Sequence, residues 1–118
     1  MSKISVVNLL GSSALLSAEK GVLLFQEIIK SLNSSSVLTL DFTGYEYISS
    51  TFINRSFGKL SVEKNWTFED LKKNISFVNL NSDDLDDIEL AVINAHERAV
   101  LLEKGVNLQQ HYSTVYNY

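Results

Sequence analysis

The stretch LTLDFTGYEYISSTFINRSF, residues 38–57, carries the pattern from which the fold is inferred. Its first part is apolar up to Asp41, as expected of a strand that is covered on at least one face. From about Ser50 onward, apolar residues recur at helical spacing instead. We therefore predict a strand over residues 37–42 and a helix that begins near Ser50. Three hydroxyl residues stand at the start of that helix: Ser49, Ser50 and Thr51.

Two more strands are predicted on either side of this stretch. Residues 3–8 are short and rich in β-branched side chains, and residues 75–80 form another apolar run. These strands alternate with helical segments, which predicts an α/β layer protein with at least partly parallel pairing. We expect residues 37–42 and 75–80 to be neighbouring core strands. For residues 107–118, an edge strand and a loose tail both remain open.

The first predicted helix and a shorter later one are marked by capping residues. Ser17 is the expected N-cap of a helix that runs to about Leu32. Residues 66–74 are amphipathic, and Thr67 with Asp70 three positions on forms a capping-box pattern. Both segments are therefore expected to start where these polar side chains can bond free backbone N–H groups.

The longest predicted helix begins at Asn81 or Ser82 and ends at the pair Lys104 and Gly105. Acidic residues crowd its first turns, where the positive end of the helix dipole favours them. Apolar side chains on this helix, on the first predicted helix and on the helix that begins near Ser50 predict the core. The residues expected to be buried are Phe25, Ile28, Phe57, Val92 and Ala95.

Composition limits the classes of function. The 118 residues have the length of one domain, so we treat residues 1–118 as a single unit. Hydrophobic residues make up 45% and charged residues 20%, which is ordinary for a soluble globular domain. A net charge of −4 gives no electrostatic basis for binding nucleic acid or an anionic membrane. The lack of cysteine and of any apolar run of about 18 residues suits the cytoplasm, where we expect the protein.

The sequence predicts neither catalysis nor a bound cofactor. His96 and His111 are too far apart to form a metal-ligand motif, and His96 is expected on the polar surface of its helix. The acidic run near Asp83 is interrupted by Leu85 and Ile88, unlike a calcium-binding loop. The glycines form neither a P-loop nor a dinucleotide-binding pattern, and no G-x-S-x-G motif is present. We therefore expect a protein that is not an enzyme.

The three hydroxyls admit two interpretations. Capping by Ser49 or Ser50 would stabilise the helix by about 1 kcal/mol, but capping requires only one of them. The point where a strand ends and a helix begins is also where open α/β sheets place their sites. A phosphoryl group there would be stabilised by the helix end, and Arg55 could reach it. The residues alone favour capping and leave both interpretations open.

Residues 40–60, LDFTGYEYISSTFINRSFGKL, resemble the signature of STAS domains, which occur in sulphate transporters and anti-sigma factor antagonists. They are most similar to a STAS-like family of unknown function found in many bacterial genomes. The shared pattern is a strand ending in Asp-Phe-x-Gly, an Ile-Ser-Ser/Thr-x-Phe element and a helix with Phe-Gly-x-Leu. The resemblance extends over about residues 3–105. The matching positions are Asp41, Phe42, Gly44, Ile48, Ser49, Ser50, Phe52, Phe57, Gly58 and Leu60.

The resemblance implies a central sheet of about four strands, three main helices and a non-enzymatic regulatory role. In established anti-sigma factor antagonists, a kinase-like anti-sigma factor phosphorylates the first serine of an Asp-Ser-Ser-Gly segment, which corresponds to Ser50. This chain differs in having Ser49 for the aspartate and Phe52 for the glycine. The implied partner is an ATPase of the histidine-kinase superfamily. The implied interaction or phosphorylation site consists of Ser50, Ser49, Thr51, Asp41 and Arg55.

Two alternatives of other classes stay open. STAS-type folds can hold nucleotides or other small molecules, and a polar-lined pocket near residues 49–51 would favour such a binding module. A flat surface there would favour a protein partner. The third possibility is a structural protein or an accessory protein of a toxin–antitoxin system.

Overall fold

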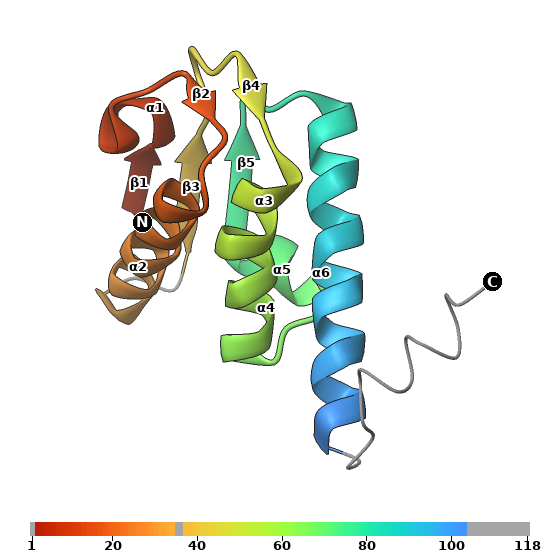
Figure 1. Cartoon of the computed structure of the whole chain (residues 1–118). Coiled ribbons are helices and arrows are strands. Elements are labelled where there is room, and N and C mark those ends of the chain that lie inside the picture. Colours follow the sequence, from red (N-terminus) through yellow and green to blue (C-terminus); the bar gives the residue numbers. More distant parts are fainter. Residues whose placement is uncertain (1, 35–36, 104–118) are drawn as a thin grey trace, which may run out of the picture.

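A parallel sheet forms the centre of the fold (Figure 1). The computed structural model describes residues 2–34 and 37–103. Within them, β1 (Ser2–Ser5), β3 (Leu38–Asp41) and β5 (Ile75–Val78) pair in the order β1-β3-β5. The register places Ile4 beside Leu40 and Leu40 beside Phe77. The predicted neighbourhood of the second and third strands is therefore confirmed.

The expected single sheet of about four strands is wrong. The described residues form three strands in one sheet and two in another, β2 (Ala14–Leu15) and β4 (Tyr47–Ile48). These two short strands also pair in parallel, beyond the ends of β1 and β3 (Figure 1). The pairing of β1 with β3 stops where α1 follows β1 and where a turn at Gly44, with φ +89°, follows β3. It then resumes as a separate two-stranded sheet.

The predicted first strand is too long. Residues 3–8 were expected to be extended, but β1 ends at Ser5 and α1 (Val6–Leu10) follows. Val6 and Leu10 are both buried, and their spacing of four is that of a helix face. Gly11 ends α1 in the left-handed conformation, with φ 67° and its N–H bonded to Val7. Burial of two side chains on one helical face thus outweighs the strand preference of the valines.

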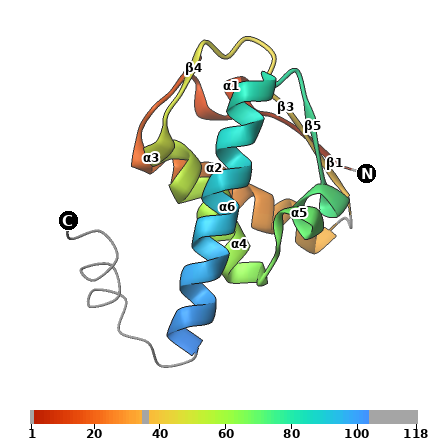
Figure 2. The same ribbon diagram turned by 90° about the vertical axis from the view of Figure 1, so that its right-hand side faces the viewer.

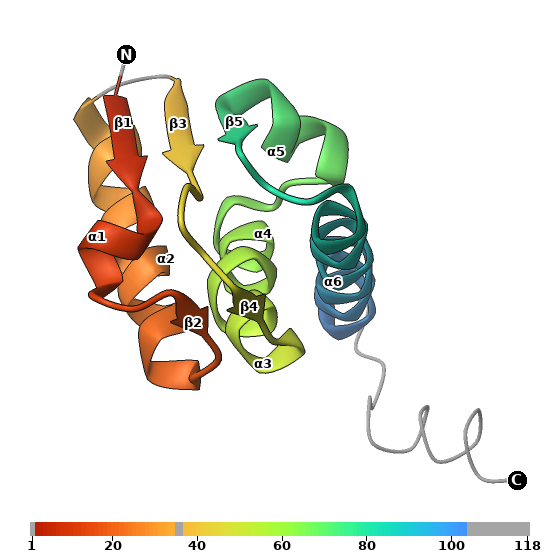
Figure 3. The ribbon, with the colours of Figure 1, turned by 90° about the horizontal axis from the view of Figure 1, so that it is seen from above.

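Helices cover one face of the central sheet (Figure 3). They form a row in which a continuous helical segment lies between α2 and α6. This segment, residues 50–64, is called the central helix below, and a π-helical turn, η1, interrupts it. The row consists of α2 (Ala18–Ser34), the central helix with α3 (Ser50–Ile53), η1 (Asn54–Gly58) and α4 (Lys59–Lys64), and α6 (Ser82–Glu103). The short helix α5 (Phe68–Asn74) lies beside β5 (Figure 3).

The capping predictions are confirmed. Ser17 Oγ accepts a hydrogen bond from the Lys20 N–H at 3.1 Å at the start of α2. Thr67 and Asp70 form a reciprocal capping box at α5. At α6 the capping residue is Asn81, whose side chain accepts a bond from the Asp83 N–H at 2.7 Å. The expected helix end at Lys104 and Gly105, the tail over residues 107–118 and His111 lie outside the described residues.

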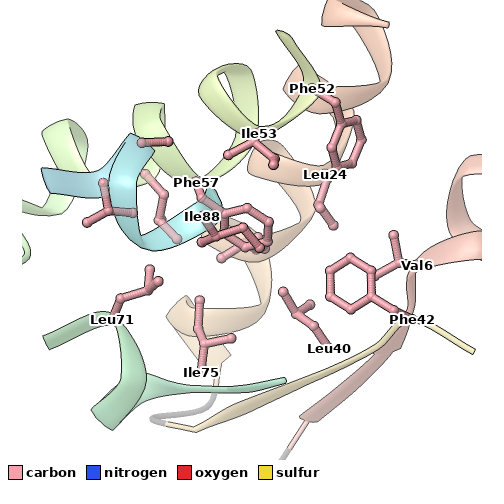
Figure 4. Close-up of a cluster of buried hydrophobic side chains, with 14 of the residues drawn as sticks. Val6, Leu24, Leu40, Phe42, Phe52, Ile53, Phe57, Leu71, Ile75 and Ile88 are labelled. Atoms are coloured by element: carbon pink, nitrogen blue, oxygen red, sulfur yellow. The ribbon is translucent and has the colours of Figure 1, made fainter. Parts of the chain in front are cut away.

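The core lies between the sheet and the helix layer (Figure 4). Leu40 and Ile75 from the strands, together with Phe42 just after β3, face Leu24, Phe52, Phe57 and Ile88 from the helices. Ile28, Phe57, Val92 and Ala95 are buried, as predicted. Phe25, however, is only partly buried, because the buried line of α2 runs through Gly21, Leu24 and Ile28 and leaves Phe25 on its flank.

None of the helices within residues 2–34 and 37–103 combines the length and the apolar character needed to cross a bilayer.

Candidate functional site

Ser49 is the N-cap of the central helix. Its Oγ accepts a hydrogen bond from the Phe52 N–H at 3.1 Å and donates one to the Leu16 carbonyl at 2.7 Å. The Ser49 N–H also bonds the Leu15 carbonyl at 3.0 Å. The residue therefore fixes the start of the helix and ties it to the chain that follows β2. This is the capping role predicted for one of the three hydroxyls.

The other two hydroxyl residues are exposed and line different grooves. Ser50 belongs to a groove of about 260 Å³ between the central helix and α6. Thr51 belongs to a second groove of about 530 Å³, also between the central helix and α6. Asn54 lines both grooves, so they adjoin each other. We call them the serine groove and the basic groove.

The serine groove combines apolar and acidic groups. Ile53 and Ala91 are buried at its base, whereas Leu90 is 58% exposed. Asp87 of α6 lines the same groove as Ser50 and brings the carboxylate of a distant chain segment to it. The full lining is Ser50, Ile53, Asn54, Asp87, Leu90, Ala91 and Asn94.

The basic groove gathers three cations. Arg55 and Lys59 come from the central helix, and Arg98 comes from α6. No acidic side chain of the described residues lines it. Arg55, predicted to reach a phosphoryl group on one of the hydroxyls, therefore shares a groove with Thr51 rather than with Ser50. The full lining is Thr51, Asn54, Arg55, Lys59, Val62 and Arg98.

The π-helical turn η1 sets the direction of these side chains. The Lys59 N–H donates to the Asn54 carbonyl, five positions back, so these two residues lie one above the other. Ser56 is buried in this turn, and its Oγ donates to the Phe52 carbonyl at 2.8 Å. The turn thus places polar residues on the groove side while Phe57 remains fully buried. A helix from about Ser50 is predicted from the sequence, and no local signal marks the π turn.

A close crossing with α2 fixes the start of the central helix. A Cβ atom added at Gly21 would lie 2.8 Å from the Phe52 carbonyl oxygen and 2.8 Å from the Arg55 Cβ. Real Cβ atoms do not approach backbone this closely. Glycine at this position therefore allows α2 to pack directly against the part of the helix that presents the hydroxyls.

Asp41 is held in a separate network at the end of β3. Its Oδ1 accepts bonds from the Thr43 hydroxyl at 2.6 Å, the Thr43 N–H at 3.0 Å and the Asn79 amide at 3.1 Å. Its Oδ2 lies 3.5 Å from the Lys3 ammonium. The bonds from the Thr43 hydroxyl and Asn79, followed by the Thr43 N–H and Lys3, hold the pKa of Asp41 well below its usual range.

Asp41 is the last residue of β3. It is ionised at neutral pH and closes the turn after the strand. Its hydrogen-bond partners in the described chain include none of Ser49, Ser50 and Thr51. The resemblance groups Asp41 with Ser49, Ser50, Thr51 and Arg55 in one site. In the structure Asp41 instead belongs to a separate hydrogen-bond network.

A second polar link, missed from the sequence, joins this turn to α6. The Tyr45 hydroxyl donates to the Asp84 carboxylate at 2.5 Å and accepts a bond from the Asn81 N–H at 3.0 Å. Burial, and then the Asp84 carboxylate, raise the pKa of Tyr45. The start of α6, and with it one wall of the serine groove, is thereby positioned against the β3–β4 connection.

His96 departs from its prediction as a surface residue. It is half-buried, and its Nδ1 is buried without a hydrogen-bond partner in the described chain. With Glu97, Val100 and Leu101 it lines a hollow of about 270 Å³ toward the end of α6.

A comparison with protein families places residues 20–85 in a model described as a STAS-like domain of unknown function. The chain belongs to this family. No curated protein and no solved structure matches the chain significantly. The family resemblance inferred from the motif around Ser50 is thereby confirmed.

The matched part of this STAS-like domain ends early in α6. It includes Ser49, Ser50, Thr51 and Arg55 but not Asp87 or the other α6 residues of the two grooves. Sequence reasoning also missed those α6 residues, because nothing local in the helix indicates which of its polar side chains meet the central helix. Only the packing of the two helices brings them together.

Proposed function

We propose that this STAS-like domain is a non-enzymatic regulatory module that binds a protein partner through the surface around Ser50. The proposal is supported by the different environments of the three hydroxyls. Ser49 is engaged in capping, whereas Ser50 is exposed on the wall of a groove. A hydroxyl that the fold does not use for its own stability is available to a partner.

We further propose a kinase-like ATPase of the histidine-kinase superfamily as the partner, with Ser50 as the phosphorylated residue. The resemblance to anti-sigma factor antagonists supports this, because their phosphorylated serine corresponds to Ser50. A phosphoryl group adds a charge of about −1.5 to −2. In the serine groove that charge would meet Asp87, and like charges in one groove repel. Phosphorylation would thus change the electrostatics of the docking surface, as a switch requires.

The basic groove favours a second candidate function, binding of a small anionic molecule such as a nucleotide. Its volume of about 530 Å³ lies within the range of ligand pockets. Its three cations would attract phosphate groups. Binding of a nucleotide that is lost on removing these cations would distinguish this function from docking of a protein.

The proposed function is tested by phosphate mapping. The purified domain is incubated with ATP and each histidine-kinase-superfamily ATPase of the source genome, and the products are digested and analysed by mass spectrometry. We expect one ATPase to place phosphate on Ser50, and Ser50→Ala to remove that signal. Phosphate found only on other residues, or on none with any of these ATPases, would contradict the assignment of Ser50.

A further inference from the structure

We infer that the basic groove docks an acidic peptide segment of a partner protein, with carboxylates bound by Arg55, Lys59 and Arg98. The inference rests on the proposed function in taking the occupant to be part of a protein. It goes further by assigning a second contact surface beside Ser50 and by stating the chemistry of what binds there.

The first support is charge. The chain as a whole carries a net charge of −4, yet this groove collects three of its cations with no acidic side chain in the lining. A positive groove on a negatively charged molecule attracts an anionic segment locally. The negative charge of the rest of the protein opposes extended polyanions, so nucleic acid and anionic membranes fit the surface poorly.

The second support is that the fold leaves these cations free for a partner. Two ion pairs occur among the described residues, Lys3–Asp41 and Lys72–Glu69, and neither uses a groove cation. Among the described residues, the hydrogen bond that Arg98 Nε donates stays within its own helix and goes to the Asn94 carbonyl at 3.4 Å. The Lys59 ammonium lies over the Phe25 ring of α2, 5.3 Å from its centre, which is a cation–π contact and not an ion pair.

The third support is the extended shape of the cation-bearing surface. On the central helix the lining runs from Thr51 through Arg55 and Lys59 to Val62, at spacings of four, four and three. At the helical rise this stripe is about 16 Å long. An extended peptide of about five residues has the same length, whereas a single phosphate would contact only one end.

The remaining lining residues suit a peptide as well. The Thr51 hydroxyl and the Asn54 amide can hydrogen-bond peptide backbone groups, and the half-exposed Val62 offers an apolar contact. Guanidinium groups bind carboxylates through two parallel N–H bonds, which gives Arg55 and Arg98 geometric selectivity. We therefore expect an acidic segment with an interspersed apolar side chain.

The test is an NMR titration of the ¹⁵N-labelled domain with a peptide of alternating glutamate and leucine, about ten residues long. We expect saturable amide shifts at residues 51–62 and around Arg98, with a Kd below about 1 mM. A peptide with glutamine in place of glutamate should bind at least about tenfold more weakly, and added salt should weaken binding of the acidic peptide. Shifts that are absent or lie elsewhere would overturn the inference.

Two triple variants separate the groove from general electrostatics. Arg55→Gln/Lys59→Gln/Arg98→Gln should weaken binding about tenfold or more. The matched control Lys30→Gln/Lys64→Gln/Lys73→Gln loses the same number of charges outside the groove lining and should leave the Kd within about twofold. Equal weakening by both variants would overturn the inference.

A further arm of the titration uses ATP and inorganic phosphate alone. Tighter binding of ATP than of the acidic peptide at the groove residues would overturn the inference in favour of a small-molecule site. No kinase-like partner is present in this experiment. A failure here therefore leaves the phosphate mapping of Ser50 unaffected, and a failure of that mapping leaves the groove result standing.

Discussion

Ser50 and Thr51 are consecutive residues, yet they line two different grooves, one containing Asp87 and the other Arg55, Lys59 and Arg98. The same negative charge would consequently have different effects at the two positions. At Ser50 it would meet a carboxylate, and at Thr51 it would meet cations. The two hydroxyls are therefore expected to respond differently to one substitution.

Thr51→Asp should leave the domain more stable than Ser50→Asp does. Both positions lie in the first turn of the central helix, where the helix end favours a negative charge, so the neighbours of the new carboxylate decide the difference. The new carboxylate at Thr51 shares its groove with three cations, whereas the one at Ser50 shares its groove with Asp87. At exposed positions the difference is expected to be about 1 kcal/mol or less, with Thr51→Asp the more stable. Urea denaturation at low and high salt measures it, and the difference should shrink at high salt. An unchanged difference at high salt would exclude an electrostatic origin.

The cap at Ser49 gives a prediction about the helix start. Ser49→Ala removes the bonds to the Phe52 N–H and the Leu16 carbonyl and should lower the free energy of unfolding by about 1–2 kcal/mol. Thr51→Ala, at an exposed position next to it, is the control and should change stability by less than about 0.5 kcal/mol. Equal effects of the two substitutions in thermal denaturation would contradict the capping role.

Two glycines of the helix layer are expected to respond oppositely to alanine. At Gly21 a Cβ would lie 2.8 Å from the Phe52 carbonyl, so Gly21→Ala should cost about 1–3 kcal/mol. At Gly58 the nearest atom, the Ala95 Cβ, lies 3.8 Å away, and Gly58→Ala should be neutral or stabilising by up to about 1 kcal/mol. Urea denaturation midpoints measure the stability of both variants. A Gly21→Ala variant as stable as the wild type would show that α2 does not pack as closely as described.

The depressed pKa of Asp41 predicts a pH dependence of stability. The folded chain holds this pKa below its ordinary value of 3.8, so the unfolded chain binds the proton more readily. The stabilisation from the carboxylate is therefore present above about pH 4 and is lost as the pH falls toward the folded pKa.

Asp41→Asn tests this pH dependence. The variant should be less stable than the wild type at neutral pH, and the difference should narrow in strong acid. Asp86→Asn, exposed on α6, is the control for removing one carboxylate. Urea midpoints at about pH 7 and about pH 2.5 measure the effect. A constant gap between Asp41→Asn and the wild type across that range would contradict it.

Features encoded by neighbouring residues could be predicted from the sequence. Ser17 and the Thr67–Asp70 pair act within one turn of a helix and were placed correctly as caps, and Asn81 is one of the two residues predicted to cap α6. The alternation of strands and helices likewise predicted parallel pairing, and the apolar runs predicted that β3 and β5 are neighbours. The motif around Ser50 predicted the family.

Features that depend on packing could not be predicted in the same way. In α1, burial of Val6 and Leu10 overrides a run of residues with strand preference. The separation of Ser50 from Thr51 requires the packing of α6 along the central helix, and in Figure 2 α6 runs in front of that helix. The link from Tyr45 to Asp84 joins segments far apart in the chain. None of these has a local sequence signal.

The central claim is that a partner docks around Ser50. Its most direct test is isothermal titration calorimetry of three variants of the domain against the ATPase that phosphorylates it. If Ser50 lies in the docking surface, Ser50→Asp should weaken binding about tenfold or more, while Ser50→Ala should leave the Kd within about twofold. Ser76→Asp, an exposed serine on β5, should also bind like the wild type. Equal affinities of Ser50→Asp, Ser50→Ala and the wild type would place the partner elsewhere and contradict the account.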